Sequence, residues 1–403
     1  MKKSMIVAAM LAMVATGANA KSATDSATIA KNKPVFTVVK QNPITSIKDQ
    51  NRSGTCWAYS TLSYFESEIL KHTGKTYDLS EMFVANKTYM DRATMAVRMH
   101  GDVSFSQGGS AYDVLYALQH YGIVPEGAMP APGTLTGDSL ANFGEFFDVM
   151  TPYVEAVAKS NAKKISSAWK SGLQGIIDSY IGKAPEKFTY EGKQYTPQSF
   201  CQSLGLNLDD YVTITSYTHH PMWSKFAVEV QDNWRWPLSY NVPMEDICKI
   251  IDNAVNNGYT VAWGGDVTED GFTRKGLGIA YDVKKVRSMA GTDADHWFKL
   301  SKDEKKEKFD SLGVNAPEIV PTQAMRQEAF DNWETTDDHG MHIYGIAKDQ
   351  NGKEYYMVKN SWGEYGDYKG TWYMTKAFVA YKTMDFMVNK NALPKDIRKK
   401  LGI

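Results

Sequence analysis

The residues best suited to chemistry in this chain are a cysteine, two histidines, an asparagine and a glutamine. Cys56 follows Gln50 by six positions, in the run QNRSGTCWAYS. Far downstream, the run DHGMH holds His339 and His342, and the run NSWG begins at Asn360. A thiol nucleophile needs a base, a group that orients the base, and donors that stabilise an oxyanion. These residues, in this order, predict nucleophilic thiol chemistry.

A helical pattern begins beside Cys56 and predicts how its thiol is activated. Apolar residues recur at i, i+4, i+7 and i+11 from Ala58 to Ile69, on one helix face. In the first turn of that helix, the thiolate of Cys56 would face unpaired N–H groups and the positive end of the helix dipole. We expect the Gln50 amide and the Cys56 N–H to form an oxyanion hole. Taken alone, Cys56 would favour a buried structural cysteine, since buried cysteines are common.

The base must be His339 or His342, and the residues alone do not decide between them. Asn360 would accept a hydrogen bond from the ring N–H that faces away from sulfur and so hold the productive tautomer. Trp362 would shield that bond from water. The purely structural alternative for the NSWG run is a turn between two strands.

A metal site is a second alternative for the histidine segment, since four potential ligands fall within six residues. They are Asp337, Asp338, His339 and His342. Zinc sites usually draw their ligands from more than one local run, so we predict no metal. The pair His219-His220 is expected to lie in a surface loop.

Length and composition describe an ordinary globular protein. The chain has 403 residues, long for one compact domain unless that domain carries large insertions, with 43% hydrophobic and 23% charged residues. The formal net charge of −1 supplies no basic surplus, and we expect no nucleic-acid partner.

The N-terminus has the composition of an export signal. Residues 1–20 combine two lysines, a short apolar run and an Ala-x-Ala ending, which predicts a cleavable signal peptide. The apolar run is too short to span a bilayer, so we expect no membrane attachment. Residues 21–33 are small and polar, as in a flexible leader. The mature protein is predicted to be periplasmic or secreted.

Besides Cys56 the chain has two cysteines, Cys201 and Cys248. In an exported protein these two can form a disulfide, but two unpaired thiols are at least as well supported, because nothing in the sequence brings them together.

Periodicity predicts helices first and strands later. The expected helices are Ser80–Met99, Ser110–Tyr121, an all-helical stretch over Ala141–Ile181, and Pro243–Asn257. The charged run Ser301–Lys308 fits a solvated helix face. The expected strands are Tyr259–Trp263, Leu277–Val283, Met341–Ala347, Glu354–Lys359 and Thr371–Thr375.

These motifs resemble the papain-like cysteine peptidases. Gln-x5-Cys-Trp-Ala-x-Ser and Asn-Ser-Trp-Gly carry the likeness, and the runs LSE from Leu79 and QGG from Gln107 fit it too. Cys56 and His339 are 283 positions apart, against roughly 130–150 in papain and cathepsins. The additional residues fall where the bleomycin hydrolase and bacterial aminopeptidase C branch carries helical insertions, so the chain is most similar to that branch.

The resemblance implies an α+β papain-like domain over residues 34–403, with a helical subdomain, an antiparallel β-barrel-like subdomain and a helical insertion at about 130–240. It implies an aminopeptidase acting on peptides, with His339 as the base because Gly345 follows it by six positions, as in that branch. Gly108, Gly109 and Trp362 would contact substrate. The branch requires no metal or organic cofactor and forms hexamers, so a homo-oligomer is expected.

Two departures from the branch keep other functions open. The branch is usually cytosolic, whereas this chain has an export signal. Its members also continue into a C-terminal arm whose carboxylate holds the substrate's amino group, whereas this sequence stops at Ile403. An endopeptidase with an open cleft is therefore one alternative. A papain-fold protein that binds peptides without cleaving them is another.

Overall fold

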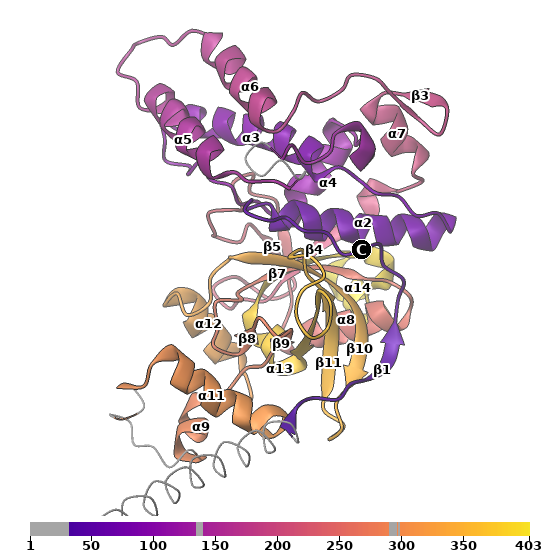
Figure 1. Cartoon of the computed structure of the whole chain (residues 1–403), viewed down its shortest axis with the longest axis vertical. Coiled ribbons are helices and arrows are strands. Elements are labelled where there is room, and N and C mark those ends of the chain that lie inside the picture. The colour runs from indigo at the N-terminus through magenta and orange to yellow at the C-terminus, as the bar shows by residue number, and fades with distance from the viewer. Residues whose placement is uncertain (1–31, 134–139, 290–295, 297–298) are drawn as a thin grey trace, which may run out of the picture.

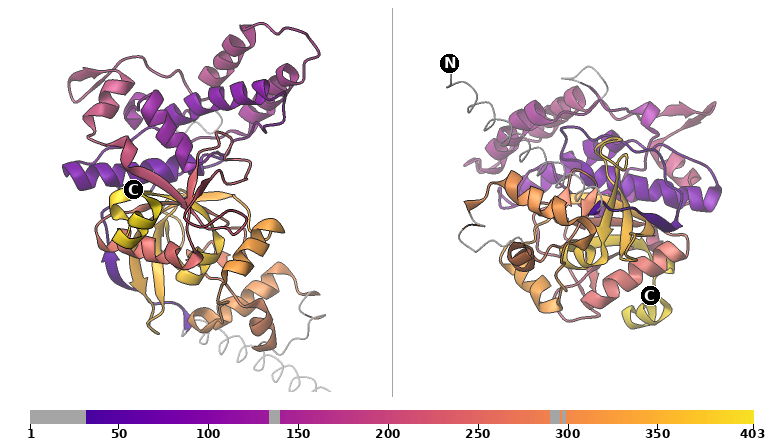
Figure 2. Two further views of the ribbon diagram at one scale, coloured as in Figure 1. Left: turned by 180° about the vertical axis from the view of Figure 1, so that it is seen from behind. Right: turned by 60° about the horizontal axis from the view of Figure 1, so that its bottom comes forward.

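The computed structural model describes residues 32–133, 140–289, 296 and 299–403. The chain forms a helical half and a sheet half, with helix α2 (Cys56–Thr73) running along the boundary between them (Figure 1). Figure 2 shows the same separation from behind. The expectations for residues 1–31 lie outside the described residues. Among the described residues, no helix combines the length and apolar character needed to cross a membrane.

The helical half packs around an apolar core that includes the buried face of α2. Thirteen consecutive residues of α2, from Trp57 to Ile69, are buried, so the helix is covered on all sides along most of its length. The other helices of this half are α3 (Glu81–Arg98), α4 (Ala111–His120), α5 (Gly144–Ala158), α6 (Ala168–Tyr180) and α7 (Pro197–Ser203).

The sheet half is built on a mostly antiparallel sheet whose strands run in the order β5-β6-β4-β13-β7-β10-β11-β12-β9-β8, with β1 also paired to β10. The longer strands are β1 (Thr37–Gln41), β4 (Tyr211–Thr215), β7 (Val261–Gly265), β10 (His339–Lys348), β11 (Glu354–Lys359), β12 (Thr371–Thr375) and β13 (Thr383–Asn389). The short ones are β5 (Lys225–Phe226), β6 (Ser239–Asn241), β8 (Phe272–Thr273) and β9 (Leu277–Gly278). A separate hairpin joins β2 (Phe188–Tyr190) and β3 (Lys193–Tyr195).

Strands β7 and β10 lie between two helices. Helix α2 contacts both strands from the helical half, and α8 (Met244–Asn256) contacts them as well. A second apolar core joins α8 and these strands to α13 (Lys376–Lys382) and α14 (Lys395–Leu401). Further helices of this half are α9 (Val283–Met289), α11 (Lys302–Leu312) and α12 (Gln323–Asp331). Because every residue of β10 except the last is buried, this strand is the centre of the sheet half.

Most predicted elements are confirmed to within a few residues. Helices α2, α3, α4 and α8 and strands β7, β10, β11 and β12 lie where periodicity placed them. The charged run from Ser301 begins α11, capped by Ser301 and with residues 301–304 exposed, as a solvated helix face predicts.

Three expectations differ from the structure. The stretch Ala141–Ile181 is two helices joined by a loop, not one helical run. Within the insertion expected at about 130–240, residues after α7 form β4, β5 and β6, because they pair with β13 and with one another. The strand expected over Leu277–Val283 ends at Gly278, and α9 begins at Val283.

Cys201 and Cys248 are free thiols, so the disulfide alternative is wrong. The Cys201 Sγ donates to the carbonyl of Leu118 at 3.6 Å, and the Cys248 Sγ donates to that of Lys376 at 3.6 Å. Each thiol therefore belongs to a different half of the molecule.

The first turn of α2 lies against the start of β10 at a glycine. A Cβ added to Gly340 would come within 2.7 Å of Ser60 Oγ and 3.4 Å of the Cys56 carbonyl oxygen. Real Cβ contacts of 2.7 Å essentially do not occur, so any larger residue would have to displace the Ser60 side chain and would press on the backbone of Cys56. The approach brings Cys56 and His339 to the same boundary.

We predict that Gly340→Ala loosens this contact and lowers the free energy of unfolding by about 1–3 kcal/mol, the usual cost of overpacking. Chemical denaturation monitored by circular dichroism measures the change. Gly127→Ala is the matched control, because a Cβ there meets nothing within 4 Å. Equal stability of the two variants would contradict the close packing of α2 on β10.

Candidate active site

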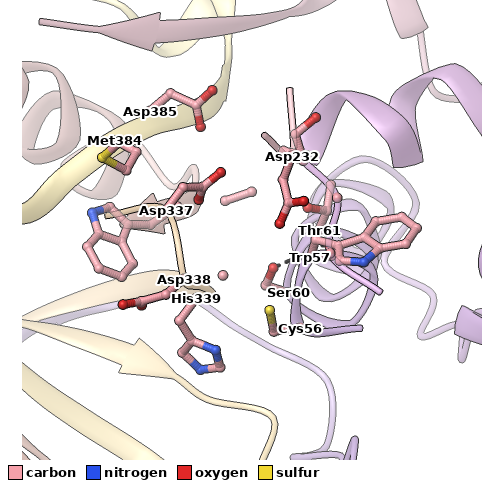
Figure 3. Close-up of a pocket in the computed structure, with 18 of the residues that line it drawn as sticks. Cys56, Trp57, Ser60, Thr61, Asp232, Asp337, Asp338, His339, Met384 and Asp385 are labelled. Atoms are coloured by element: carbon pink, nitrogen blue, oxygen red, sulfur yellow. Dashed lines mark hydrogen bonds between the residues drawn. The ribbon is translucent and has the colours of Figure 1, made fainter. Parts of the chain in front are cut away.

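A cavity of about 380 Å³ opens where the two halves meet and contains the thiol and imidazole singled out in the sequence (Figure 3). Cys56 enters it from the start of α2, and His339 enters it from the start of β10. The other predicted site residues that line it are Gln50, Gly108, Gly109 and Trp362. Asn360 lies directly behind His339. The fold therefore brings every one of the predicted site residues together.

The loop before α2 is held rigidly by its own hydrogen bonds. Ser53 Oγ donates to the Gln50 carbonyl at 2.7 Å, and the Gly54 N–H donates to Gln107 Oε1 at 2.7 Å. Thr55 is the N-cap residue, but its side chain does not cap the helix. The first N–H groups of α2 are thus left for the sulfur and for a ligand, as is usual at a helix N-terminus.

Asn360 fixes the tautomer of His339. Its Oδ1 accepts from the Ser361 N–H at 2.8 Å and lies 2.9 Å from His339 Nε2. Because the Ser361 N–H can only donate, the atom that faces it must be the amide oxygen, so the ring must donate from Nε2. His339 Nδ1 then carries the lone pair. This arrangement suits a ring that accepts a proton through Nδ1.

Burial disfavours a single charge on either member of the Cys56–His339 pair. Burial raises the pKa of Cys56 to about 12, although the backbone groups of Gly340 and Trp57 act in the opposite direction. Burial also lowers the pKa of His339 to about 4, against a smaller upward effect of the bond to Asn360. The neutral thiol and neutral imidazole are therefore favoured when each is considered alone, and a proton moved from sulfur to the ring creates two opposite charges together.

Gln50 is held in one orientation by three bonds. Its side-chain Nε2 donates to the Ser53 carbonyl at 2.7 Å, and its Oε1 accepts from Ser361 Oγ at 2.7 Å. Its backbone N–H donates to the Ser361 carbonyl at 2.8 Å. The second N–H of Nε2 has no acceptor among the described residues. A fixed amide with one unused donor, lining the cavity beside Cys56, has the properties of an oxyanion-hole group.

Aromatic side chains cover the His339–Asn360 bond. The Trp362 ring lies 5.0 Å from the His339 ring, centroid to centroid, and is itself packed edge-on against Trp372 and Phe272. Asn360 is almost fully buried, and its Nδ2 has no partner among the described residues. The predicted shielding by Trp362 therefore has a structural basis, and the two further rings were not expected.

His342 faces a different environment from His339. It is fully buried, and its Nδ1 lies 2.9 Å from Ser63 Oγ on α2. Since His339 and His342 point to different partners, the histidine segment does not form the metal site weighed above. Among the described residues, the group of three potential metal ligands that does converge is His219, His220 and Glu229, in a partly exposed loop where both rings hydrogen-bond to the carboxylate.

Four carboxyl groups of the described residues line the cavity: Asp338, weighed in the sequence only as a metal ligand, and three more whose role the sequence did not indicate. Asp337 precedes β10, Asp385 lies on β13, and Asp232 lies in the loop after β5. Asp337 was considered only as a metal ligand. Asp385 belongs to a strand that periodicity did not single out, and Asp232 lies in the expected helical insertion. No local signal links the three, because they meet only through the fold.

Comparison with known proteins agrees with this arrangement. A model of the Peptidase C1-like family matches residues 2–334 and 309–402. Aminopeptidase G of Lactobacillus delbrueckii subsp. lactis is 24% identical over 391 residues, covering 88% of this chain and 83% of the relative. Bleomycin hydrolase of Gallus gallus is 21% identical over 399 residues, covering 87% of this chain and 81% of the relative.

The fold has a counterpart among solved structures. The crystal structure of PepW from Lactobacillus rhamnosis superposes with a TM-score of 0.67 at 19% identity, covering 94% of this chain and 86% of that chain. Because the family model spans nearly the whole sequence, this protein belongs to the Peptidase C1-like family and is a cysteine peptidase of papain-like fold, similar to aminopeptidase C and bleomycin hydrolase.

Proposed function

We propose that the protein is an aminopeptidase that hydrolyses peptides by thiol catalysis, with Cys56 as nucleophile and His339 as base. The observation that carries the proposal is the convergence of Cys56 with an imidazole whose tautomer is fixed by Asn360. The relatives named aminopeptidase G and aminopeptidase C support the choice of exopeptidase action.

In the acylation step, Cys56 Sγ attacks the peptide carbonyl while its proton moves to His339 Nδ1. The two charges formed offset each other in a site that disfavours either one alone. The Cys56 N–H and the unused N–H of Gln50 Nε2 stabilise the oxyanion. His339 then protonates the leaving amine, which leaves a thioester on Cys56.

In the deacylation step, water gives a proton to His339 and attacks the thioester. The acid product leaves, and the proton returns to the thiolate of Cys56. The backbone of Gly108 and Gly109 lines the cavity and can hydrogen-bond an extended peptide. Trp362 keeps water from the His339–Asn360 bond, so the ring keeps its orientation through both steps.

We also propose that the protein is exported, on the composition of residues 1–20, and that it forms a homo-oligomer, on the family resemblance. N-terminal sequencing of the protein recovered from fractionated cells tests the first. Light scattering coupled to size-exclusion chromatography tests the second, and a hexamer is the expected size.

We predict that the protein cleaves a fluorogenic peptide with a free N-terminus, under reducing conditions, much faster than its N-acetylated twin. Cys56→Ala should lower kcat/KM by at least about 10³-fold, because no other group can form the acyl-enzyme. Initial rates with both substrates measure the two effects.

Cys248→Ala is the matched control, since this thiol lies in the sheet half, outside the cavity, and should keep full activity. Equal cleavage of both peptides would favour the endopeptidase alternative. Activity that survives in Cys56→Ala would exclude Cys56 as the nucleophile.

We predict that alkylation of Cys56 by iodoacetamide depends on His339. His339 must be neutral to accept the thiol proton, and burial lowers its pKa from the ordinary 6.5 to about 4. Alkylation should therefore persist as pH falls through 6.5 and be lost nearer 4. In His339→Ala, the thiol titrates alone with a raised pKa, so alkylation should be slow at pH 7 and rise about tenfold per pH unit above it.

His342→Gln, which can still bond Ser63, serves as the comparison and should retain the profile of the unmodified protein. If the pH dependence of alkylation changed in His342→Gln and stayed the same in His339→Ala, the base would be His342 and not His339. Mass spectrometry of the Cys56 peptide follows the modification in all three proteins.

A further inference from the structure

One wall of the active-site cavity is strongly acidic. Asp232, Asp337, Asp338 and Asp385 all line it, and no lysine or arginine is among the described residues that do. In Figure 3 the carboxylates of Asp232, Asp337 and Asp385 lie to one side of Cys56 and His339, around the same space. All three come from segments of the sheet half, and Asp232 also pairs with Arg92 on α3 of the helical half. The site thus places four carboxyl groups in the cavity that holds the reacting thiol.

Two of these carboxylates have no partner among the described residues. Asp337 and Asp385 accept no hydrogen bond and form no ion pair there, and both are half-buried. An unpaired carboxylate in such a place is costly unless something else compensates it. Both of them line the catalytic cavity.

The charge of Asp232 is partly compensated, but through only one of its two oxygens. Its Oδ1 accepts hydrogen bonds from the Arg92 guanidinium at 3.0 Å and from Ser106 Oγ at 3.3 Å. Its Oδ2 receives no hydrogen bond from the described residues. Arg92 is fully buried, and it also donates to the carbonyls of Ser104 and Gly108, so it has little capacity left for Asp337 or Asp385.

The carboxyl groups that line this wall disfavour one another's charged forms. Burial and the carboxylates of Asp232, Asp385 and Asp338 raise the pKa of Asp337, and burial raises the pKa of Asp385 to about 7. A bound cation would reverse both effects by favouring the charged carboxylates. Asp337 and Asp232 also influence the pKa of Cys56, so the cation would lie close to the nucleophile.

We propose that Asp337, Asp385 and Asp232 form a subsite for a cationic group of the substrate, either its free amino terminus or a basic side chain next to the scissile bond. An ammonium has three N–H donors to share among convergent carboxylate oxygens, and a guanidinium has five. The subsite rests on the proposed peptidase function and names the chemistry by which that site selects its substrates.

The test compares Asp385→Asn and Asp337→Asn with the unmodified protein on three fluorogenic substrates. These are alanyl-, N-acetylalanyl- and N-acetyllysylalanyl-aminomethylcoumarin. We expect each variant to lower the ratio of kcat/KM for cationic over neutral substrate by about tenfold or more, mainly through KM, because a charge-assisted hydrogen bond is lost.

The comparison between the three substrates identifies which part of the substrate carries the cation that the subsite binds. A loss confined to the alanyl substrate assigns the subsite to the free amino terminus, and a loss confined to the lysyl substrate assigns it to a side chain. Asp148→Asn is the matched control, because Asp148 is exposed on α5 and does not line the cavity. Ratios that stay unchanged in both variants, or that fall equally in the control, overturn the proposal.

A second readout does not depend on peptide cleavage. Cys56 is alkylated with 2-bromoethylammonium, which is cationic, and with iodoacetamide, which is neutral. If the subsite exists, Asp385→Asn should lower the ratio of the alkylation rate with the cationic reagent to that with the neutral reagent by about tenfold. An unchanged ratio of the two rates contradicts the proposal. If the unmodified protein cleaves no peptide, the proposed function fails while this ratio still decides the subsite. The iodoacetamide rate also reports whether each variant keeps an intact site.

Discussion

The close approach of α2 to β10 is the constraint on which the site depends. Gly340 removes the side chain that would hold strand and helix apart, so that Cys56 at the helix N-terminus and His339 at the strand start share one cavity. Every other feature of the site is arranged around this contact. The loop from Gln50 to Thr55 delivers the oxyanion donor to it, and the turn after β11 delivers Asn360 behind the ring.

The burial of the two reacting groups decides the electrostatics of the site. A buried thiol and a buried imidazole both resist a lone charge, so the favourable event is the transfer of one proton between them. Asn360 and the rings around Trp362 keep the imidazole in the tautomer that can accept it. The acidic wall follows the opposite logic, because Asp337 and Asp385, which have no partner among the described residues, gain stability when a cation binds beside them.

The sequence predicted those parts that are encoded locally. Cys56, with its helix, and Asn360, after its strand, lie in runs whose spacing carries the chemistry, and the long helices and strands follow from periodicity. The choice of His339 over His342 came from family resemblance, because two histidines three positions apart on one segment are equally plausible bases until their neighbours are known. Asp232 and Asp385 could not be predicted, since they are 153 positions apart and meet only through the fold. Strand β4 was missed because its partner β13 is also distant in sequence, and the short strands β5 and β6 pair only beside it.

The central claim is that Cys56, activated by His339, becomes acylated by the substrate. The most direct test traps that intermediate by mixing the protein with a slowly hydrolysed amino-acid thioester, quenching with acid, and mapping the adduct by mass spectrometry. The account predicts one acyl group, on Cys56, whose formation slows greatly in His339→Ala. An adduct on Cys201 or Cys248, or acylation at an equal rate without His339, would contradict it.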